Sequence, residues 1–260
     1  MEKVLNSVSK FTEEETEAYL LAVYGGLITT ESLSLNYHEV VGGFLYNGVL
    51  KGWGAVRFNE LEAEILAGIT ENVYVFSAAK QYQQVREMEA IIKAFSRSAN
   101  ELIPFAEFQK GALEIFETYN KNWLRTEFDT AIAQSQNAKK WAKIQAEKEI
   151  FPLVQYKTQN DGLVRDAHAA LHNVIKPVDD PFWTNNMPAN GWNCRCFTQQ
   201  LDEGEVTENV KELTEEEQPE LFRMNAGKDK MIFDPKKHPY FSIARGDAEL
   251  RTNNFNLPKP

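Results

Sequence analysis

The sequence is poor in cysteine and has no long apolar run. Two cysteines among 260 residues do not form the disulfide framework that holds small secreted domains. No run of about 18 apolar residues suggests a membrane span. The first residues, MEKVLNSVSKFTEEE, lack the apolar core of a signal peptide. These absences predict a soluble chain that is made in a cytosol and has no membrane partner.

Positive charge is also scarce. The chain has 28 Lys and Arg residues against 38 Asp and Glu residues, which gives a formal net charge of -10. Such a field repels the nucleic-acid backbone and argues against broad DNA contact. A local stripe of lysines remains a candidate DNA contact: Lys139, Lys140, Lys143 and, further along, Lys148. A solvated helix face is the commoner arrangement for such a stripe, and the sequence favours it here.

The N-terminal half has the patterns of helices. Hydrophobic residues make up 43% of the chain and aromatic residues 12%, enough for a packed core in one or two domains. In EEETEAYLLAVYGGL the acidic residues precede the apolar ones, as a helix N-terminus favours. Gly25 and Gly26 are expected to end this helix. A second helix is expected over SLNYHEVVGGFLYNGVL.

From about residue 60 to 150 the helical signal strengthens. Aromatic and small residues recur at spacings near three and four and make one apolar face: Phe105, Phe108, Ala112, Phe116, Tyr119, Trp123 and Phe128. A continuous helix to Glu149 would exceed forty residues, so we expect a break near SQNAKK. This part is predicted to be scaffold.

The character of the sequence changes at Phe151. LVQYKTQ and NCRCFTQQL read as strands, NDG as a turn and LVRDAHAALHNV as a helix. The predicted fold class is therefore α+β, with a helical N-terminal half and a smaller mixed α+β C-terminal half. The predicted regions are an N-terminal helical extension (1–58), a helical scaffold (59–150) and a motif region with a polar tail (151–260).

Both cysteines lie in NGWNCRC, residues 190–196. On an extended strand, side chains alternate, so Cys194 and Cys196 would point to one face and Arg195 to the other. Two sulfurs on one face supply half of a tetrahedral zinc shell.

Nearby residues offer the remaining zinc ligands. His168 and His172 are four apart and would share one face of a helix, and Asp179 and Asp180 carry carboxylates. The sequence thus predicts a structural zinc bound by Cys194, Cys196 and His168, with His172 or Asp179 completing the shell.

Other interpretations of these residues stay open. The thiols can be reduced and buried, a disulfide across one residue is strained, Asp180 can prepare the turn with Pro181, and the histidines can be packing or capping residues. A metal-dependent nuclease or hydrolase using His168, His172 and Asp180 is a further alternative. No nucleophile elbow, phosphate loop, HExxH or dinucleotide fingerprint supports an enzyme.

The order of the motifs resembles a known family. Arg165-x-x-His168, then DDPFW, Pro188 and NGWNCRC resemble the phage Mu F-like family of minor head, or head morphogenesis, proteins. The resemblance extends upstream to Arg125-Thr126-Glu127 and downstream to FRMNAGKDKMIFDPKKHPYF, covering about residues 60 to 245. Ala189 and Ala226 stand where the family has proline.

The resemblance implies a structural role in a tailed phage or prophage. Such a chain would be a low-copy protein of the virion head that assembles in the host cytoplasm with the portal and with capsid or scaffold proteins. Some members are thought to contact packaged DNA. Related branches carry a further Cys-x-x-Cys pair that looks metal-binding, which this chain lacks. A delivery module related to phage-derived toxins is an alternative, but the short stretch after the motif leaves little room for a toxin domain.

The motif also has a structural interpretation. Phe182, Trp183 and Trp192 would anchor the loop by burying rings of about 150–250 Å² each, and Gly191 would follow Asn190 in a tight turn.

The two arginines of the motif are expected to bridge carboxylates. Arg165 and Arg195 would pair with Asp179 or Asp180, because guanidinium binds carboxylate in a bidentate manner.

Overall fold

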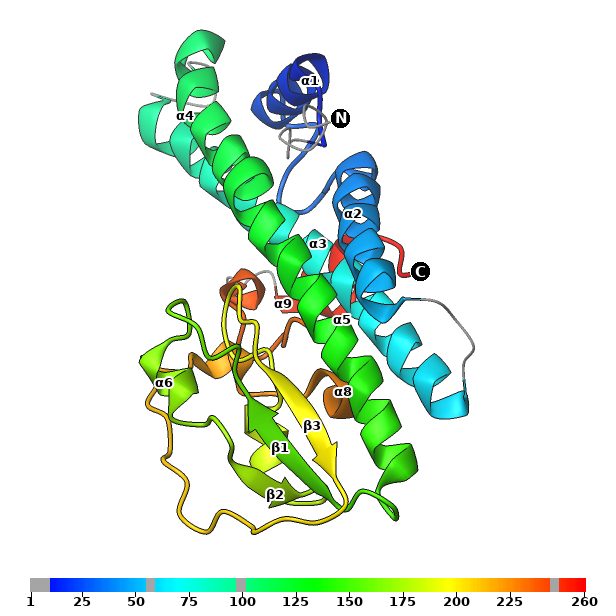
Figure 1. The fold of residues 1–260 in the computed structure, drawn as a ribbon. Coiled ribbons are helices and arrows are strands. Elements are labelled where there is room, and N and C mark those ends of the chain that lie inside the picture. Colours follow the sequence, from blue (N-terminus) through cyan, green and yellow to red (C-terminus); the bar gives the residue numbers. More distant parts are fainter. Residues whose placement is uncertain (1–9, 55–58, 97–101, 244–247) are drawn as a thin grey trace, which may run out of the picture. The chain divides into compact units, whose positions relative to one another are not determined.

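The computed structural model describes residues 10–54, 59–96, 102–243 and 248–260 (Figure 1). The helices are α1 Glu13–Tyr24, α2 Leu35–Trp53, α3 Glu60–Phe95, α4 Phe105–Glu117, α5 Leu124–Glu147, α6 Asp166–Ala169, α7 Phe182–Asn186, α8 Ala226–Asp229 and α9 Ala248–Thr252. The strands are β1 Leu153–Lys157, β2 Ile175–Pro177 and β3 Phe197–Leu201. A π-helical segment and short 3-10 turns complete the order: η1 Thr118–Trp123, η2 Glu220–Phe222, η3 Pro239–Phe241 and η5 Asn254–Asn256. A mostly helical chain with a small antiparallel sheet is α+β, as the sequence predicts. No helix of the described residues has the length and apolarity to cross a membrane.

The chain forms two compact units, and each is assembled from distant segments. Unit 1 contains residues 1–45, 73–128 and 238–260, and unit 2 contains residues 46–72 and 129–237. The sequence predicted three successive regions instead. The predicted boundary at residue 58 lies in residues 55–58, outside the described part of the chain.

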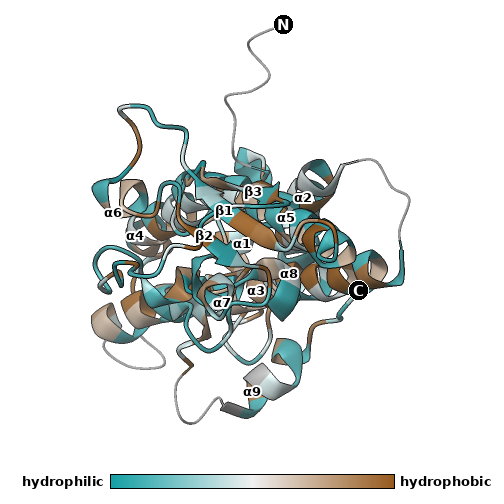
Figure 2. Cartoon of the chain, turned by 60° about the horizontal axis from the view of Figure 1, so that its bottom comes forward, coloured by the Kyte–Doolittle hydropathy of each residue, from teal (hydrophilic) through white to brown (hydrophobic). Residues whose placement is uncertain are grey.

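The first two helices form where the sequence predicts them. Thr12 caps α1 by accepting a hydrogen bond from the backbone N–H of Glu15, whose carboxylate accepts from the N–H of Thr12, a capping box. Gly25 is the C-cap. Hydrophobic and hydrophilic residues share the same helices, as amphipathic helices require (Figure 2).

The break in the long helical region lies elsewhere than predicted. α5 continues through SQNAKK, residues 135–140, and the irregularity is η1, residues 118–123. The polar residues in and beside SQNAKK do not end the helix because they bond within the fold. The amide of Gln134, just before this stretch, donates to the Ala189 carbonyl, and the Asn137 amide donates to the Ala133 carbonyl.

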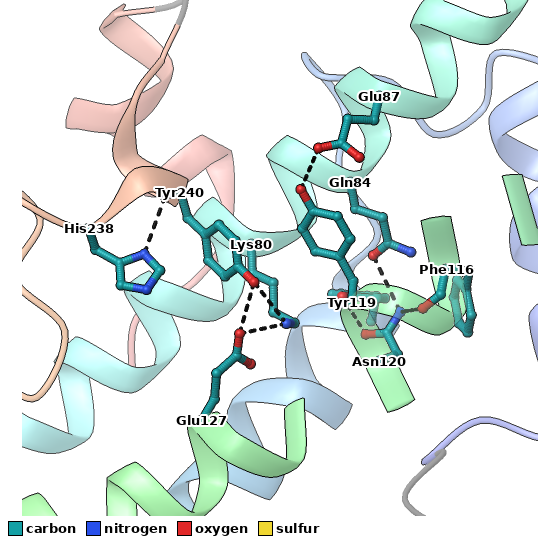
Figure 3. Close-up of polar contacts among 10 residues, drawn as sticks. Lys80, Gln84, Glu87, Phe116, Tyr119, Asn120, Glu127, His238 and Tyr240 are labelled. Atoms are coloured by element: carbon teal, nitrogen blue, oxygen red, sulfur yellow. Dashed lines mark hydrogen bonds and ion pairs between the residues drawn. The ribbon is translucent and has the colours of Figure 1, made fainter. Parts of the chain in front are cut away.

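A buried ion pair lies in unit 1 (Figure 3). Lys80 of α3 is fully buried, and its Nζ donates to Glu127 Oε1 at 2.8 Å. The Tyr240 hydroxyl donates to the same carboxylate oxygen at 2.9 Å. Lys80 Nζ also lies 5.3 Å from the centre of the Tyr119 ring. Burial lowers the pKa of Lys80, and the Glu127 charge opposes that shift.

Unit 2 contains the sheet. Its strand order is β2-β1-β3, and both pairs are antiparallel. The hydrophobic core of this unit joins α5, the sheet and the loops after it, through Trp141, Ile144, Val154, Tyr156, Leu171, Val174, Val178, Trp183, Met187, Ala189, Cys194 and Cys196. Both cysteines are therefore core residues.

Candidate metal centre

Sheet register brings the histidine and cysteine segments to one edge of the sheet. Lys157, the last residue of β1, pairs with Phe197, the first residue of β3. The chain leaving β1 and the chain entering β3 therefore meet at the same end of the sheet. α6, which carries His168, follows β1 and lies toward this end (Figure 1).

The cysteines precede β3 rather than lying in it. The prediction of a strand over all of NCRCFTQQL is wrong for its first part, because the ladder begins at Phe197. The alternation of side chains nevertheless holds. Cys194 and Cys196 are each 8% exposed, whereas Arg195 between them is exposed.

Three donor atoms converge at this edge. His168 Nδ1 lies 3.6 Å from the sulfur of Cys194 and 3.6 Å from the sulfur of Cys196. The three possible ligand atoms lie within 4.8 Å of one another. His168 is 2% exposed, and its Nε2 is buried without a hydrogen-bond partner among the described residues. Among the described residues, these three form the group that could hold a metal.

The two thiols titrate as a pair. The hydrogen bond from the Cys196 thiol lowers the pKa of Cys194, and His168 lowers it further. The same bond, with burial, raises the pKa of Cys196. Burial raises the pKa of the neighbouring Tyr156, and the two cysteines add to that shift.

The other proposed ligands bond elsewhere. His172 Nδ1 accepts from the backbone N–H of Thr158 at 3.1 Å and lies 2.8 Å from its hydroxyl. Asp180 accepts from the backbone N–H of Phe182, and Asp179 pairs with Lys148. The structure does not bring His172, Asp179 or Asp180 into the group around His168.

The arginine partners differ from those expected. Arg195 forms two hydrogen bonds of 2.8 Å with the carboxylate of Asp161, which follows β1. Arg165 donates to the carbonyl of Trp192 at 2.6 Å. The expected bridges to Asp179 or Asp180 are wrong, because these carboxylates are taken by Lys148 and by the backbone of the Pro181 turn.

The aromatic residues of the motif are buried to different degrees. Trp183 is 1% exposed, and its indole N–H donates to the carbonyl of Pro177. Phe182 and Trp192 are half-buried and pack edge to face against Trp183 and Phe222, respectively. Trp183 is therefore the main anchor.

The turn into the cysteine segment comes later than expected. It is formed at Trp192 and Asn193, and Asn193 adopts a left-handed φ of 58°. Asn190 is fully buried, and its side chain accepts from the Tyr156 hydroxyl at 2.9 Å. Gly191 lies against the Arg165 guanidinium, so that a Cβ there would come within 3.3 Å of Arg165 Nη1.

The lysine stripe is bonded within unit 2. Lys139 donates to the carbonyl of Trp53, and Lys140 donates to the carbonyl of Thr198. Lys143 lies 3.8 Å from the carboxylate of Glu147. Burial lowers the pKa of Lys140, and the nearby Lys143 charge adds to that shift. The three ammonium groups do not form one free basic face.

Two cavities meet at the cysteines. One, of about 630 Å³, is lined by α5 residues such as Asp129 and Lys140 together with Cys194 and Cys196. The other, of about 20 Å³, is lined by His168 and both cysteines. The two cysteines therefore border both a wide pocket and a space that holds about one water-sized sphere.

Residues outside the predicted set also hold this region. Asn225 caps α8 with its side chain and donates to the carbonyl of Trp183. A Cβ on Gly227 would lie 2.6 Å from Trp141 Cβ, so only glycine fits there without a shift. Both residues lie in FRMNAGKDK, and the polar Asn before a small residue was the available signal.

Comparisons with known proteins agree with the resemblance noted in the motifs. Residues 60–199 match the family described as Phage Mu protein F like protein. The chain is 26% identical over 182 residues to the protein named "Putative capsid assembly protein F" of Escherichia phage Mu, a match covering 64% of the chain and 38% of that protein. It is 32% identical over 138 residues to the "Mu-like prophage FluMu F protein" of Haemophilus influenzae. This match covers 52% of the chain and 33% of that protein.

The matches span about a third of the length of these relatives. No solved structure is similar enough to match. The family match covers more than half of the chain and includes His168 and both cysteines. The chain belongs to the Phage Mu protein F-like family.

Proposed function

We propose that this chain is a structural minor head protein that acts in head morphogenesis with the portal and with capsid or scaffold proteins. The observation that carries the proposal is the family match over residues 60–199, together with a relative whose name refers to capsid assembly. The chain would act in the bacterial cytoplasm during assembly and remain in the virion head.

The contacts of the motif are consistent with a structural role. The side chains of Arg165, Trp183 and Asn225 bond to backbone carbonyls of unit 2. The carboxylate of Asp180 accepts from a neighbouring backbone N–H. The polar groups of the motif therefore hold loops that have little regular structure of their own.

The nuclease or hydrolase alternative lacks a geometric basis in its original form. It required His168, His172 and Asp180 to act together, and the described structure does not gather these three residues. Direct DNA contact through the lysine stripe is not part of the proposal, because Lys139 and Lys140 donate to carbonyls within unit 2.

Deletion and complementation in a phage or prophage that encodes the chain test this proposal. Heads purified from the deletion strain should be absent or aberrant by electron microscopy, and the wild-type gene should restore them. The restored particles should contain the chain, and the portal should co-purify with it before packaging. Normal heads from the deletion strain, with the chain missing from wild-type particles, would contradict the proposal.

A matched pair of variants separates a folding defect from a lost interface. Trp183→Ala removes a buried anchor and should abolish complementation together with stability. Lys143→Ala changes an exposed side chain of α5 and should complement like the wild type. Failure of Lys143→Ala in a stably folded protein would instead indicate that the lysine stripe has a direct role.

A further inference from the structure

We propose that His168, Cys194 and Cys196 bind one zinc ion and that its fourth ligand is an exchangeable water molecule. The inference is independent of the head-assembly proposal, since it depends on the geometry of three side chains in unit 2. It departs from the expectation of a closed four-residue shell.

The separations of the donor atoms fit a tetrahedral zinc ion. Zinc binds thiolate at about 2.3 Å and imidazole nitrogen at about 2.0–2.1 Å, so a tetrahedral angle separates sulfur from nitrogen by about 3.6 Å. His168 Nδ1 lies 3.6 Å from both sulfurs. Two independent nitrogen–sulfur distances therefore match the edge length of the same tetrahedron.

The chemistry of the donors selects the metal. Thiolate and imidazole are soft and borderline ligands that favour zinc over magnesium or calcium. Iron–sulfur clusters are commonly held by four thiolates, and the chain has two cysteines. Two thiolates and a neutral imidazole also balance the charge of the divalent ion, which eases its burial beside residues that are at most 8% exposed.

The residues around the triad supply support but no fourth ligand. The other lining residues of the small cavity include Gln159, Arg165 and Arg195, which have hydrogen bonds of their own. No other described His, Cys, Asp or Glu residue places a ligand atom with those of His168, Cys194 and Cys196.

The cavities leave space for an exchangeable ligand. The small cavity of about 20 Å³ borders all three donors, and a water needs at least about 10–15 Å³. Both sulfurs also border the wide pocket of about 630 Å³. A three-residue shell with solvent access is the coordination that leaves a zinc ion open to exogenous ligands.

Metal analysis and X-ray absorption of the full-length wild-type protein, purified without chelator and supplied with zinc, test the proposal directly. We expect one zinc per chain, two sulfur neighbours at about 2.3 Å and two nitrogen or oxygen neighbours. Zinc well below one per chain, or fewer than two sulfur neighbours, would overturn the site. This arm requires no variant, so a folding defect cannot obscure it.

Cobalt substitution tests the open position. Azide or imidazole added to the cobalt protein should shift its visible d–d bands while the thiolate charge-transfer band persists. His172→Ala is the matched control and should keep both the cobalt spectrum and the response to azide. A spectrum that does not respond to either ligand, or that changes in His172→Ala, would overturn the open position and favour a closed shell.

Variants of the ligands complete the test. Loss of an outer-shell partner typically weakens metal binding by about 10–100-fold. His168→Ala should weaken zinc binding by more than this, as measured by competition with a chromophoric chelator. Cys194→Ser should lose the charge-transfer intensity of one thiolate. Wild-type zinc affinity in folded His168→Ala protein would overturn the assignment of the nitrogen ligand.

Discussion

Each unit buries a group of ionisable side chains, and the two groups are completed in different ways. In unit 1, Lys80 and Glu127 are opposite charges joined at 2.8 Å, and Tyr240 bonds the same carboxylate. In unit 2, the possible ligand atoms of His168 and the two cysteines lie within 4.8 Å of one another. The group in unit 1 compensates its own charge, whereas the zinc ion that we propose would complete the group in unit 2.

Removal of one charge from unit 1 should have the largest effect. Glu127→Gln leaves Lys80 buried without its counter-charge, and we expect a loss of about 3–5 kcal/mol in the free energy of unfolding, measured by urea denaturation. Replacing both residues, as Lys80→Met with Glu127→Leu, should cost less than the single change. A Glu127→Gln protein as stable as the wild type would show that the pair does not need mutual compensation.

Metal removal should have the next largest effect, and only in unit 2. A chelator should lower the melting temperature of the wild-type protein, because zinc at about 100 times its dissociation constant stabilises by about 2.7 kcal/mol. The Cys194→Ser/Cys196→Ser protein should melt at the same temperature with and without chelator. Equal responses of the two proteins would remove the distinction between the two groups.

Acid should weaken unit 1 through a buried histidine. Burial, aided by the Lys80 charge, lowers the pKa of His238 to about 3, from an ordinary value of 6.5. Between these values the unfolded chain binds a proton that the folded chain does not, so stability is lost as pH falls below about 6.5, by at most about 1.4 kcal/mol per pH unit.

A single variant isolates this contribution. His238→Asn keeps an acceptor for the backbone N–H of Tyr240, which His238 Nδ1 now provides, but does not titrate. Its urea midpoint should fall less between pH 7 and pH 5 than that of the wild type. Part of the pH dependence should persist, because burial lowers the pKa of His38 too. Parallel curves would contradict the assignment.

The smallest effect is expected beside the triad. Arg195 and Asp161 form an ion pair whose side chains are 45% and 43% exposed, and such pairs add little to stability. Arg195→Ala should therefore leave the melting temperature nearly unchanged and the zinc content intact. A marked loss of zinc in this variant would indicate that the loop after β1 positions the ligands.

Local sequence patterns predicted those structural features that depend on contacts between residues close in sequence. The N-terminus of α1 follows from Thr12 and Glu15, which lie three residues apart and cap each other. The position of η1 did not follow, because a long-range contact lies within it. Asn120 is fully buried and accepts from the Tyr37 hydroxyl at 2.7 Å, across 83 residues of sequence.

The candidate site was predictable in part for the same reason. Alternation identified Cys194 and Cys196 as neighbours on one face, and the structure keeps that alternation. The shared face of His168 and His172 required a helix through both residues, but α6 ends at Ala169. The chain then turns, and His172 is directed to Thr158 instead. The spacing of the two histidines alone could not reveal that α6 ends before His172.

Unit 1 combines segments that are far apart in the sequence, and this has a consequence for its synthesis on the ribosome. Lys80 and Tyr240 are 160 residues apart in sequence and meet in one buried group. At about 5–20 residues per second, the ribosome needs on the order of ten seconds or more to add that length. During this interval, the nascent chain cannot complete the burial of Lys80 and must keep its ammonium group hydrated. The buried core of unit 1 can therefore be completed only after the C-terminal segment has been synthesised.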